Sequence, residues 1–332
     1  MISVSSPVDT SIPDPQAPCP ARVVTPALPP DDLRIPFAED ETIVFASSSG
    51  HCNLDCSYCV VQPVAKHQPS LTYEDLRFVL DSLGGRVFFI FSGSGDFFAG
   101  YRQRERLLAR LLEHDNVRVA LDINGVSVHC VDELSATQLG RIAHVNLTFH
   151  YKQLVAHRAL QVWLDNALSL LCKLDGPDFH LNMVLSPAEH DLWEEALTWY
   201  AANVAAPTGK RLVLINDVNR PFDEIHEASL QRVHSRFAEV IRSVRRGNFE
   251  ALFDTFDRAS CPAGQAYLRL RNDGRIDACP NVAQLQSIGN AKLRTLRLRS
   301  DPFECRDVRH CDCYHIASAG RMVFVRDEPP QP

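Results

Sequence analysis

The sequence predicts an α/β fold in which helices cover a parallel sheet, followed by a smaller C-terminal domain. Between residues 40 and 248, six apolar segments rich in β-branched or aromatic residues alternate with six segments of helical apolar spacing. Strands that alternate with helices form right-handed crossovers and pair in parallel. The chain of 332 residues, 45% of them hydrophobic, is long enough for one large domain and one small one. Periodicity alone leaves open whether the sheet is a curved partial barrel or a flat doubly wound sheet.

The first 39 residues are expected to lie outside this domain. Nine prolines stand among small polar residues between Met1 and Glu39, without apolar periodicity. Such a segment cannot bury enough surface to offset its ordering entropy. We predict a leader that is disordered or draped over the core.

Six pairs of a strand and a helix are expected in order along the chain. The predicted strands are 42–46, 86–91, 117–123, 144–149, 179–185 and 211–215. The predicted helices are 73–83, 102–113, 132–142, 162–174, 188–200 and 224–244. Thr72 is a suitable N-cap for the first helix. Whether the sheet is open or barrel-like, ligands bind at the carboxyl ends of parallel strands, so these ends are where a site is expected.

Three cysteines follow the first strand on one short loop. The segment reads His51-Cys52-Asn53-Leu54-Asp55-Cys56-Ser57-Tyr58-Cys59, which is the spacing C-x3-C-x2-C. Thiolates favour iron–sulfur clusters or zinc, and three clustered cysteines do not pair evenly into disulfides. A [4Fe–4S] cluster has four irons, so three cysteines leave one iron without a protein ligand. A zinc ion would need a fourth ligand, which His51 or His67 could supply.

This segment resembles the signature of the radical S-adenosylmethionine (SAM) superfamily, including the aromatic Tyr58 before the third cysteine. The resemblance implies a partial (β/α)6 barrel and a [4Fe–4S] cluster held by Cys52, Cys56 and Cys59, with SAM bound to the open iron. In that family an electron from the cluster splits SAM into methionine and a 5′-deoxyadenosyl radical.

The ends of the next three strands extend the resemblance. Gly93-Ser94-Gly95-Asp96 is similar to the glycine-rich motif that holds the SAM amino group, with Asp96 where relatives usually have Glu. Asn124-Gly125 and Thr148-Phe149-His150 close the third and fourth strands. The resemblance implies cofactor contacts from Tyr58, Gly93, Ser94, Gly95, Asp96, Asn124 and Thr148, and a place for His150 facing the substrate or a proton-transfer path. Without the resemblance, the glycine segment is an ordinary turn and His150 is a hydrogen-bonded rim histidine.

A second cysteine group lies near the C-terminus: Cys261, Cys279, Cys305, Cys311 and Cys313. Between the first two, an Asn-Asp-Gly turn within 267–278 favours a hairpin, and a helical stretch is expected around 292–298. The region resembles the Twitch domain, a shortened SPASM domain that binds one auxiliary [4Fe–4S] cluster. The resemblance assigns Cys261 and Cys279 as ligands and leaves Cys305, Cys311 and Cys313 as candidates for the other two positions. A zinc site with four thiolates is the alternative.

These observations divide the chain into a leader at 1–39, a radical SAM barrel at 40–248 and an α+β Twitch-type domain at 249–332. A net charge of −7 without a basic block disfavours nucleic acid as a partner. No apolar run of roughly twenty residues and no secretion signal is present, so a cytoplasmic protein is expected.

The resemblance implies an enzyme that abstracts a hydrogen atom from its substrate, in the dehydrogenation or epimerisation of a sugar-like or other small natural-product intermediate. Its electron donor would be a protein such as a flavodoxin or ferredoxin. The alternatives are a peptide-modifying radical SAM maturase and a non-catalytic zinc-binding scaffold.

Overall fold

The computed structural model describes residues 22–24, 37–59, 69–93, 95–99, 106–174, 178–217, 220–245, 258–279, 287–305 and 323–326. The strands are β1 Arg22–Val24, β2 Glu41–Ser47, β3 Arg86–Ser92, β4 Val117–Ile123, β5 Ile142–Thr148, β6 Asp178–Leu185, β7 Leu212–Asn216, β8 Ile241–Arg245, β9 Arg258–Cys261, β10 Tyr267–Leu270, β11 Arg275–Asp277, β12 Ser287–Asn290, β13 Thr295–Leu296, β14 Phe303–Cys305 and β15 Val323–Arg326. The α-helices are α1 Tyr73–Leu83, α2 Leu107–Leu111, α3 Ala136–Leu139, α4 Tyr151–Ala156, α5 Leu160–Lys173, α6 Trp193–Tyr200, α7 Ala206–Thr208 and α8 Glu224–Arg236.

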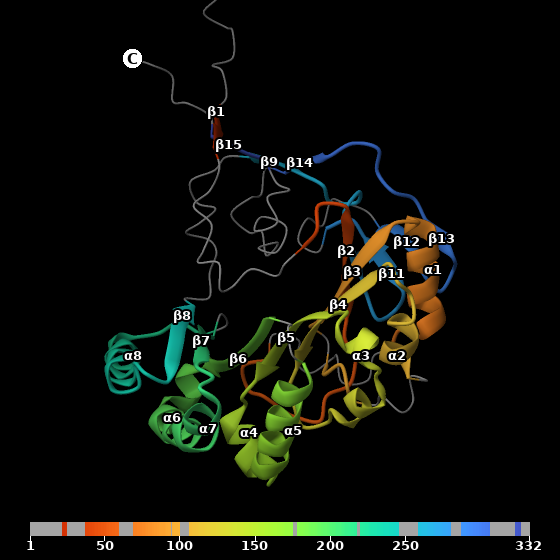
Figure 1. The fold of residues 1–332 in the computed structure, drawn as a ribbon. Coiled ribbons are helices and arrows are strands. Elements are labelled where there is room, and N and C mark those ends of the chain that lie inside the picture. Colours follow the sequence, from red (N-terminus) through yellow and green to blue (C-terminus); the bar gives the residue numbers. More distant parts are fainter. Residues whose placement is uncertain are drawn as a thin grey trace, which may run out of the picture.

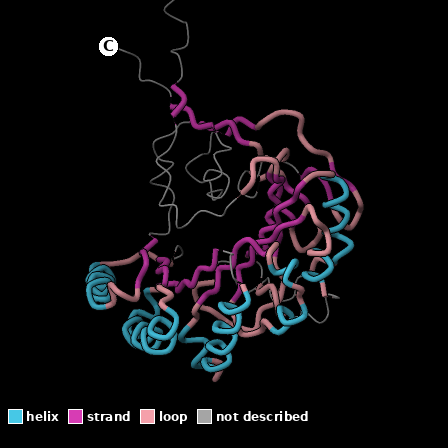
Figure 2. The backbone as a smooth tube through the Cα atoms, in the orientation of Figure 1, coloured by secondary structure: helices cyan, strands magenta, loops and turns pink. Residues whose placement is uncertain are grey.

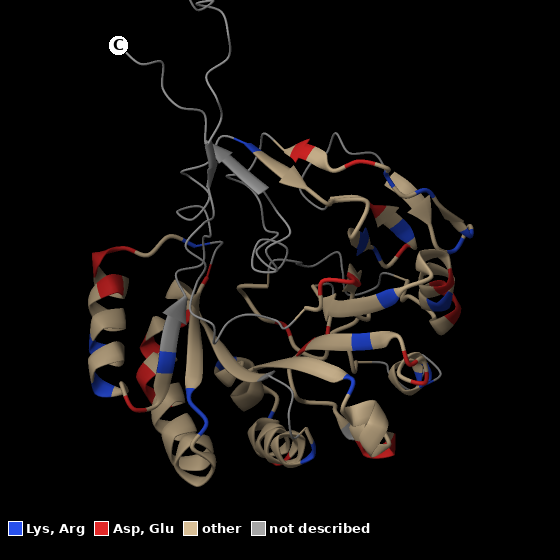
Figure 3. Cartoon of the chain, turned by 45° about the horizontal axis from the view of Figure 1, so that its top comes forward, with Lys and Arg blue, Asp and Glu red and all other residues tan. Residues whose placement is uncertain are grey.

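The central feature is an eleven-stranded sheet in the order β13-β12-β11-β10-β2-β3-β4-β5-β6-β7-β8. Strands β2 to β8 pair in parallel in chain order, with helices between them. In Figures 1 and 2 these strands follow an arc, and the helices lie along its outer side. Both basic and acidic residues occur along the outer helices (Figure 3). The predicted α/β fold with a parallel sheet is therefore confirmed.

The two faces of the curved sheet pack against different partners. On the helix-facing side, Phe89 and Phe91 of β3 share one large apolar core with Leu76 and Val79 of α1. On the inner side, Phe88 shares a second apolar cluster with residues of β9 and β14. These two strands belong to a four-stranded sheet in the order β1-β15-β9-β14. The inner face at β2 and β3 is therefore covered by the C-terminal strands. The same four-stranded sheet includes β1 at 22–24, which lies within the expected leader.

The hairpin predicted after Cys261 is present, and it extends the main sheet. Strand β10 pairs with β11 in antiparallel fashion and with β2 in parallel. The prediction of a helix around 292–298 is wrong. The Asn290 side-chain oxygen accepts the N–H groups of Lys292 and Leu293 at 2.9 and 3.1 Å, which closes a tight turn. Thr295 then pairs with Asn290, so the segment forms the hairpin β12–β13. Within the described residues of 258–326, all regular structure is strand, which differs from the expected α+β arrangement.

The last predicted helix, 224–244, ends early. Helix α8 stops at Arg236, and the N–H groups of Val240 and Ile241 both donate to the Phe237 carbonyl in a turn. The chain then joins the sheet as β8 beside β7. The apolar residues at 237, 240, 241 and 244 fit helical spacing. The segment forms a strand instead, because its β-branched residues can pair in parallel with the edge of β7.

Among the other predicted helices, 73–83 has the bounds of α1, and the rest match in position but differ in length. Helix α1 has the expected Thr72 cap, with a capping box to Asp75, and ends at Gly84 in the left-handed region. The expected helix at 132–142 is a 3-10 helix, His129–Glu133, followed by the short α3, because Ser135 caps a new helix start. The helix at 188–200 is a 3-10 helix, Pro187–Leu192, that continues as α6 and then as a π-helical turn, Ala201–Ala205. Of the helix expected at 102–113, 102–105 lie outside the described residues.

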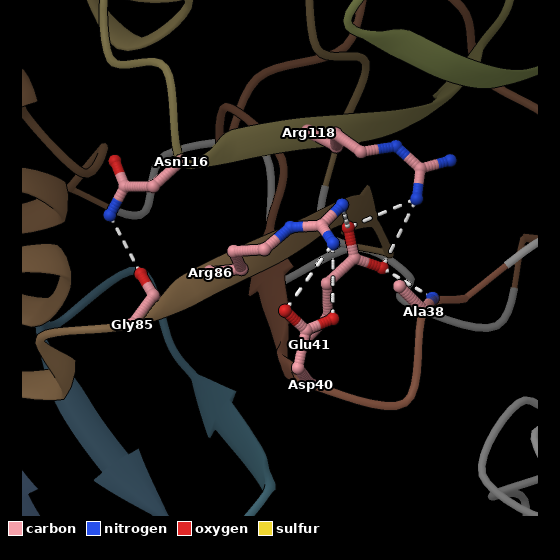
Figure 4. Close-up of polar contacts among 7 residues, drawn as sticks. All are labelled: Ala38, Asp40, Glu41, Gly85, Arg86, Asn116 and Arg118. Carbon is pink, nitrogen blue, oxygen red and sulfur yellow. Dashed lines mark hydrogen bonds and ion pairs between the residues drawn. The ribbon is translucent and has the colours of Figure 1, made fainter.

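A buried carboxylate joins the amino-terminal ends of three strands (Figure 4). The Glu41 side chain is 1% exposed and accepts hydrogen bonds from Arg118 at 3.0 and 3.2 Å. Arg86 lies 3.5 Å away, and the Ala38 N–H donates to Glu41 at 2.8 Å. This network holds β2, β3 and β4 in register at the end opposite the candidate site.

Candidate functional site

The cysteine loop follows β2 at the carboxyl edge of the sheet, as predicted. Cys56 is buried, while Cys52 and Cys59 are exposed, and none of the three forms a disulfide. Leu54, Cys56 and Tyr58 form a small apolar cluster against Val126 and Val184. The loop is therefore packed on the ends of other strands, with two thiols facing outward.

The glycine-rich turn after β3 presses directly on the cysteine loop. Gly95 has φ of +84°, and a Cβ atom there would lie 2.2 Å from the His51 carbonyl oxygen. The neighbouring Asp96 N–H donates to the same oxygen at 2.7 Å. Only glycine allows this approach. Gly93, also at positive φ, is exposed, and Ser94 lies outside the described residues.

The Asp96 carboxylate joins two strand ends. One oxygen accepts the N–H groups of Phe98 and Ala99 at 2.9 and 3.1 Å, and the other accepts the Asn124 N–H at 2.6 Å. The residue is 3% exposed. Asp96 therefore fixes the end of β4 against the turn after β3.

Asn124 continues this chain of contacts to the cysteines. Its side-chain nitrogen donates to the Asn53 side-chain oxygen at 2.6 Å and lies 3.7 Å from the Cys52 sulfur. Its side-chain oxygen accepts the Val126 N–H at 3.0 Å. The structure thus brings together the cysteine loop, Asp96 and Asn124.

His150 lies under the same loop. Its Nδ1 atom is 2.8 Å from the Tyr58 hydroxyl and 3.3 Å from the Cys56 sulfur. Burial lowers the pKa of His150 to about 4 and raises the pKa of Tyr58, so near pH 7 the tyrosine keeps its proton and can donate it to Nδ1. Thr148, two residues earlier, ends β5 half-buried, and its carbonyl accepts the Trp163 ring N–H at 3.3 Å. His150 immediately precedes α4, a helix that the sequence reading missed.

Among the described residues, no three His, Cys, Asp or Glu side chains are grouped closely enough to hold a metal ion. The donor chemistry of the loop nevertheless fits an iron–sulfur cluster. The Leu54 N–H points to the Cys52 sulfur at 3.5 Å, as hydrogen bonds to cluster sulfurs do. Burial, then the neighbouring Cys52, raises the pKa of Cys56 to about 12. Crowded thiols of this kind ionise only when a cation compensates their charge.

Four polar residues at the same edge were missed by the sequence reading. Glu189, 7% exposed, accepts the Ser57 hydroxyl at 3.2 Å and lies 3.7 Å from the Lys152 ammonium. Beyond β6 and β7, Ser186 donates to Asp217 at 2.8 Å, and both are buried. Ser186 directly follows a predicted strand and Asp217 lies two residues after another, so position was a signal for both, whereas nothing in the sequence pointed to Glu189 or Lys152.

Three cysteines of the second group lie in or beside one apolar cluster. Cys261 and Cys305 are buried in the apolar cluster on the inner face, and Cys279 packs against that cluster. None of these three forms a disulfide. Cys311 and Cys313 lie outside the described residues.

No protein-family model and no curated protein matches the chain. Among solved structures, native anSMEcpe with bound AdoMet and Cp18Cys peptide is 14% identical, with a TM-score of 0.44, covering 75% of this chain and 77% of its own. BtrN in complex with AdoMet and 2-DOIA is 12% identical, with a TM-score of 0.33, covering 86% of this chain and 87% of its own. SeMet BtrN in an open conformation is 13% identical, with a TM-score of 0.33 and 86% of both chains covered. Likenesses at this level assign neither the fold nor the activity of this chain.

No helix within the described residues is long and apolar enough to cross a membrane.

Proposed function

We propose that the chain is a radical SAM enzyme that acts on a small molecule. The observation that carries this proposal is the contact between the C-x3-C-x2-C loop and the turn at Gly95 and Asp96. Two segments more than thirty residues apart in sequence meet at the carboxyl edge of a parallel sheet, where ligands of such sheets bind.

Cys52, Cys56 and Cys59 would hold a [4Fe–4S] cluster, and SAM would bind beside it. Together they would supply a 5′-deoxyadenosyl radical that removes a hydrogen atom from the substrate. The residues of this chain position these partners. Asn124 steadies Cys52 through its bond to Asn53, and His150 fixes Tyr58 against Cys56. The packing of the cluster of Leu54, Cys56 and Tyr58 against Val126 and Val184 would limit access of water to Cys56.

The Gly93–Asp96 turn is our proposed contact for the SAM amino group. The Asp96 carboxylate already accepts three backbone N–H bonds. Its negative charge in a buried place would still attract an ammonium group nearby. Gly93 and Gly95 carry no side chains of their own, so a ligand can approach the backbone of this turn closely.

Cys261, Cys279 and Cys305, with Cys311 or Cys313, would bind a second cluster. Cys261 and Cys305 belong to one apolar cluster on the inner face and Cys279 packs against it, which supports the proposal. The reaction we propose is dehydrogenation or epimerisation, with electrons from a flavodoxin or ferredoxin.

The test is the triple replacement of Cys52, Cys56 and Cys59 by Ala. After anaerobic reconstitution, the variant should lose about half of its iron, because one of two four-iron clusters is removed. With dithionite and SAM it should form no 5′-deoxyadenosine. The Cys172→Ala variant is the matched control, since Cys172 is an exposed cysteine on α5, and it should keep full iron and full 5′-deoxyadenosine formation.

Formation of 5′-deoxyadenosine by the triple variant would place the active cluster elsewhere. A colourless wild-type protein that binds zinc and not iron after the same reconstitution would instead favour the non-catalytic scaffold.

A further inference from the structure

A group of polar side chains lines the inner face of two neighbouring strands. His144 and Asn146 lie on β5, and His180 and Asn182 lie on β6. Their chain neighbours Val145, Leu147, Leu181 and Met183 belong to the core under the helices. Because side chains alternate along a strand, the four polar residues point to the opposite, inner face. We call them the inner polar patch.

The members of the patch contact one another across the strands. Asn146 is the register partner of His180. The rings of His144 and His180 meet edge to face, with centroids 4.8 Å apart, and the Asn182 side-chain nitrogen donates to the Asn146 side-chain oxygen. The patch is therefore a built arrangement whose side chains hold one another in place.

One amide end in this patch has no partner within the part of the chain that the structure describes. Asn182 is 2% exposed, and its side-chain oxygen makes no hydrogen bond to any described residue. Exchanging the oxygen and nitrogen positions of Asn182 does not remove the problem, because one end of the amide faces Asn146 and the other end stays unpaired. Buried polar atoms in native proteins almost always have a partner, and a bound ligand is one way to provide it.

The patch lies one step along the sheet from the cysteine loop. Val184, two residues after Asn182 on β6, packs against the apolar cluster that contains Cys56 and Tyr58. On β5, the strand that carries Asn146 leads through Thr148 to His150, which contacts the same two residues. Two residues span about 6.6 Å along a strand, so a small ligand on the patch would reach the loop.

The chemistry of the patch selects one kind of ligand. Amides and imidazoles both donate and accept hydrogen bonds, as hydroxyl groups do. The patch contains no Lys or Arg to hold a carboxylate or phosphate, and Asp122 is the register partner of Asn146 on β4. An acidic neighbour disfavours an anion and tolerates an amine.

We propose that the inner polar patch binds the hydroxyl groups of a sugar-like ring that carries no acidic group. Only the further step, that this ring is the substrate of the radical reaction, rests on the proposed function.

The test is saturation-transfer NMR and titration calorimetry of the full chain with D-glucose, D-glucosamine and D-glucuronate. The first two sugars should bind, and glucuronate, which differs from glucose by its carboxylate, should bind at least about tenfold more weakly. Asn182→Leu should weaken glucose binding about tenfold and leave SAM affinity unchanged. Asn216→Leu is the matched control. Asn216 also has a buried side-chain oxygen without a hydrogen-bond partner among the described residues, but it shares the helix-facing side of β7 with Leu212 and Leu214.

Equal binding of glucuronate, binding of none of the three sugars, or a loss of SAM affinity without loss of glucose affinity in Asn182→Leu would each overturn the proposal. If circular dichroism shows that Asn182→Leu is unfolded, Asn182→Ser replaces it, with the same expected loss of glucose binding. Sugar binding is measured without turnover. A chain that binds glucose but forms no 5′-deoxyadenosine therefore contradicts the proposed function and leaves the patch standing.

Discussion

Replacing Asp96 by Ala tests the link between the glycine-rich turn and the strand ends. The change removes the acceptor of three backbone N–H bonds, at 2.9, 3.1 and 2.6 Å. A hydrogen bond to a charged group contributes about 1.5–3 kcal/mol, but two of these share one oxygen and water can enter the space left by the carboxylate. We therefore expect a loss of about 3 kcal/mol in the free energy of unfolding. At about 2.1 cal/mol/K of unfolding entropy per residue, 332 residues give roughly 0.7 kcal/mol/K and a fall in Tm of about 4 °C.

Differential scanning calorimetry of the wild type and the variant measures this shift. Asp81→Ala is the control, because Asp81 is 63% exposed and pairs with Arg77 on the surface of α1. It should change Tm by less than about 1 °C. Calorimetric titration with SAM, well below both melting temperatures, then measures the second role of Asp96. A loss of about 1–3 kcal/mol in SAM binding is expected. An Asp96→Ala variant that melts with Asp81→Ala would refute the structural reasoning.

Two further predictions concern stability. Glu41→Ala should lower the free energy of unfolding, measured by urea denaturation, by about 2–4 kcal/mol, because it removes the buried carboxylate that pairs with Arg118. The control Asp40→Ala, at a carboxylate that is 62% exposed, should lower it by less than about 0.5 kcal/mol. Equal losses in the two variants would contradict the network. Asp223 caps α8, and its pKa is lowered, first by the His226 N–H, so its contribution to stability is present above the unfolded pKa near 3.8 and is lost as the pH falls through the folded value. Asp223→Ala should therefore melt below the wild type at pH 7 and converge with it in acid, while Asp223→Asn, an equally good cap without a charge to titrate, should not show this pH dependence; parallel melting curves for the Ala variant at all pH values would exclude the cap.

The strand ends were the part of the site that the sequence could predict. Each of the first four strands was located by its apolar run, and parallel pairing places their carboxyl ends at one edge. That reasoning predicted that Cys52, Asp96, Asn124 and His150 lie near one another. It could not predict that the Asp96 carboxylate accepts hydrogen bonds from backbone N–H groups, because the distance between two loops depends on how each loop packs.

Other features depended on contacts that have no local signal. Glu189 contacts Ser57 from a 3-10 helix, whereas the apolar periodicity predicted a single helix at 188–200. Strand β8 was assigned to a helix because Ile241 and its apolar neighbours satisfy either period, and only the free edge of β7 decides between them. The parallel pairing of β10 with β2 joins residues more than two hundred positions apart, and hairpin patterns carry no information on such a partner.

The inner face of the sheet is divided, and the division relates the two cysteine groups to each other. Over β2 and β3 it is apolar and covered by the strands that carry Cys261 and Cys305. That cover reaches Ala120 and Ala143, and Ala120 is the register partner of His144, the first residue of the inner polar patch. The patch therefore begins where the cover by strands β9 and β14 ends. At its other end it approaches, through Val184, the apolar cluster that contains Cys56. On the proposed function, a sugar-like ring on the patch would lie between the two clusters, so replacing Cys261 should alter its binding even though Cys261 is far from the SAM loop in sequence.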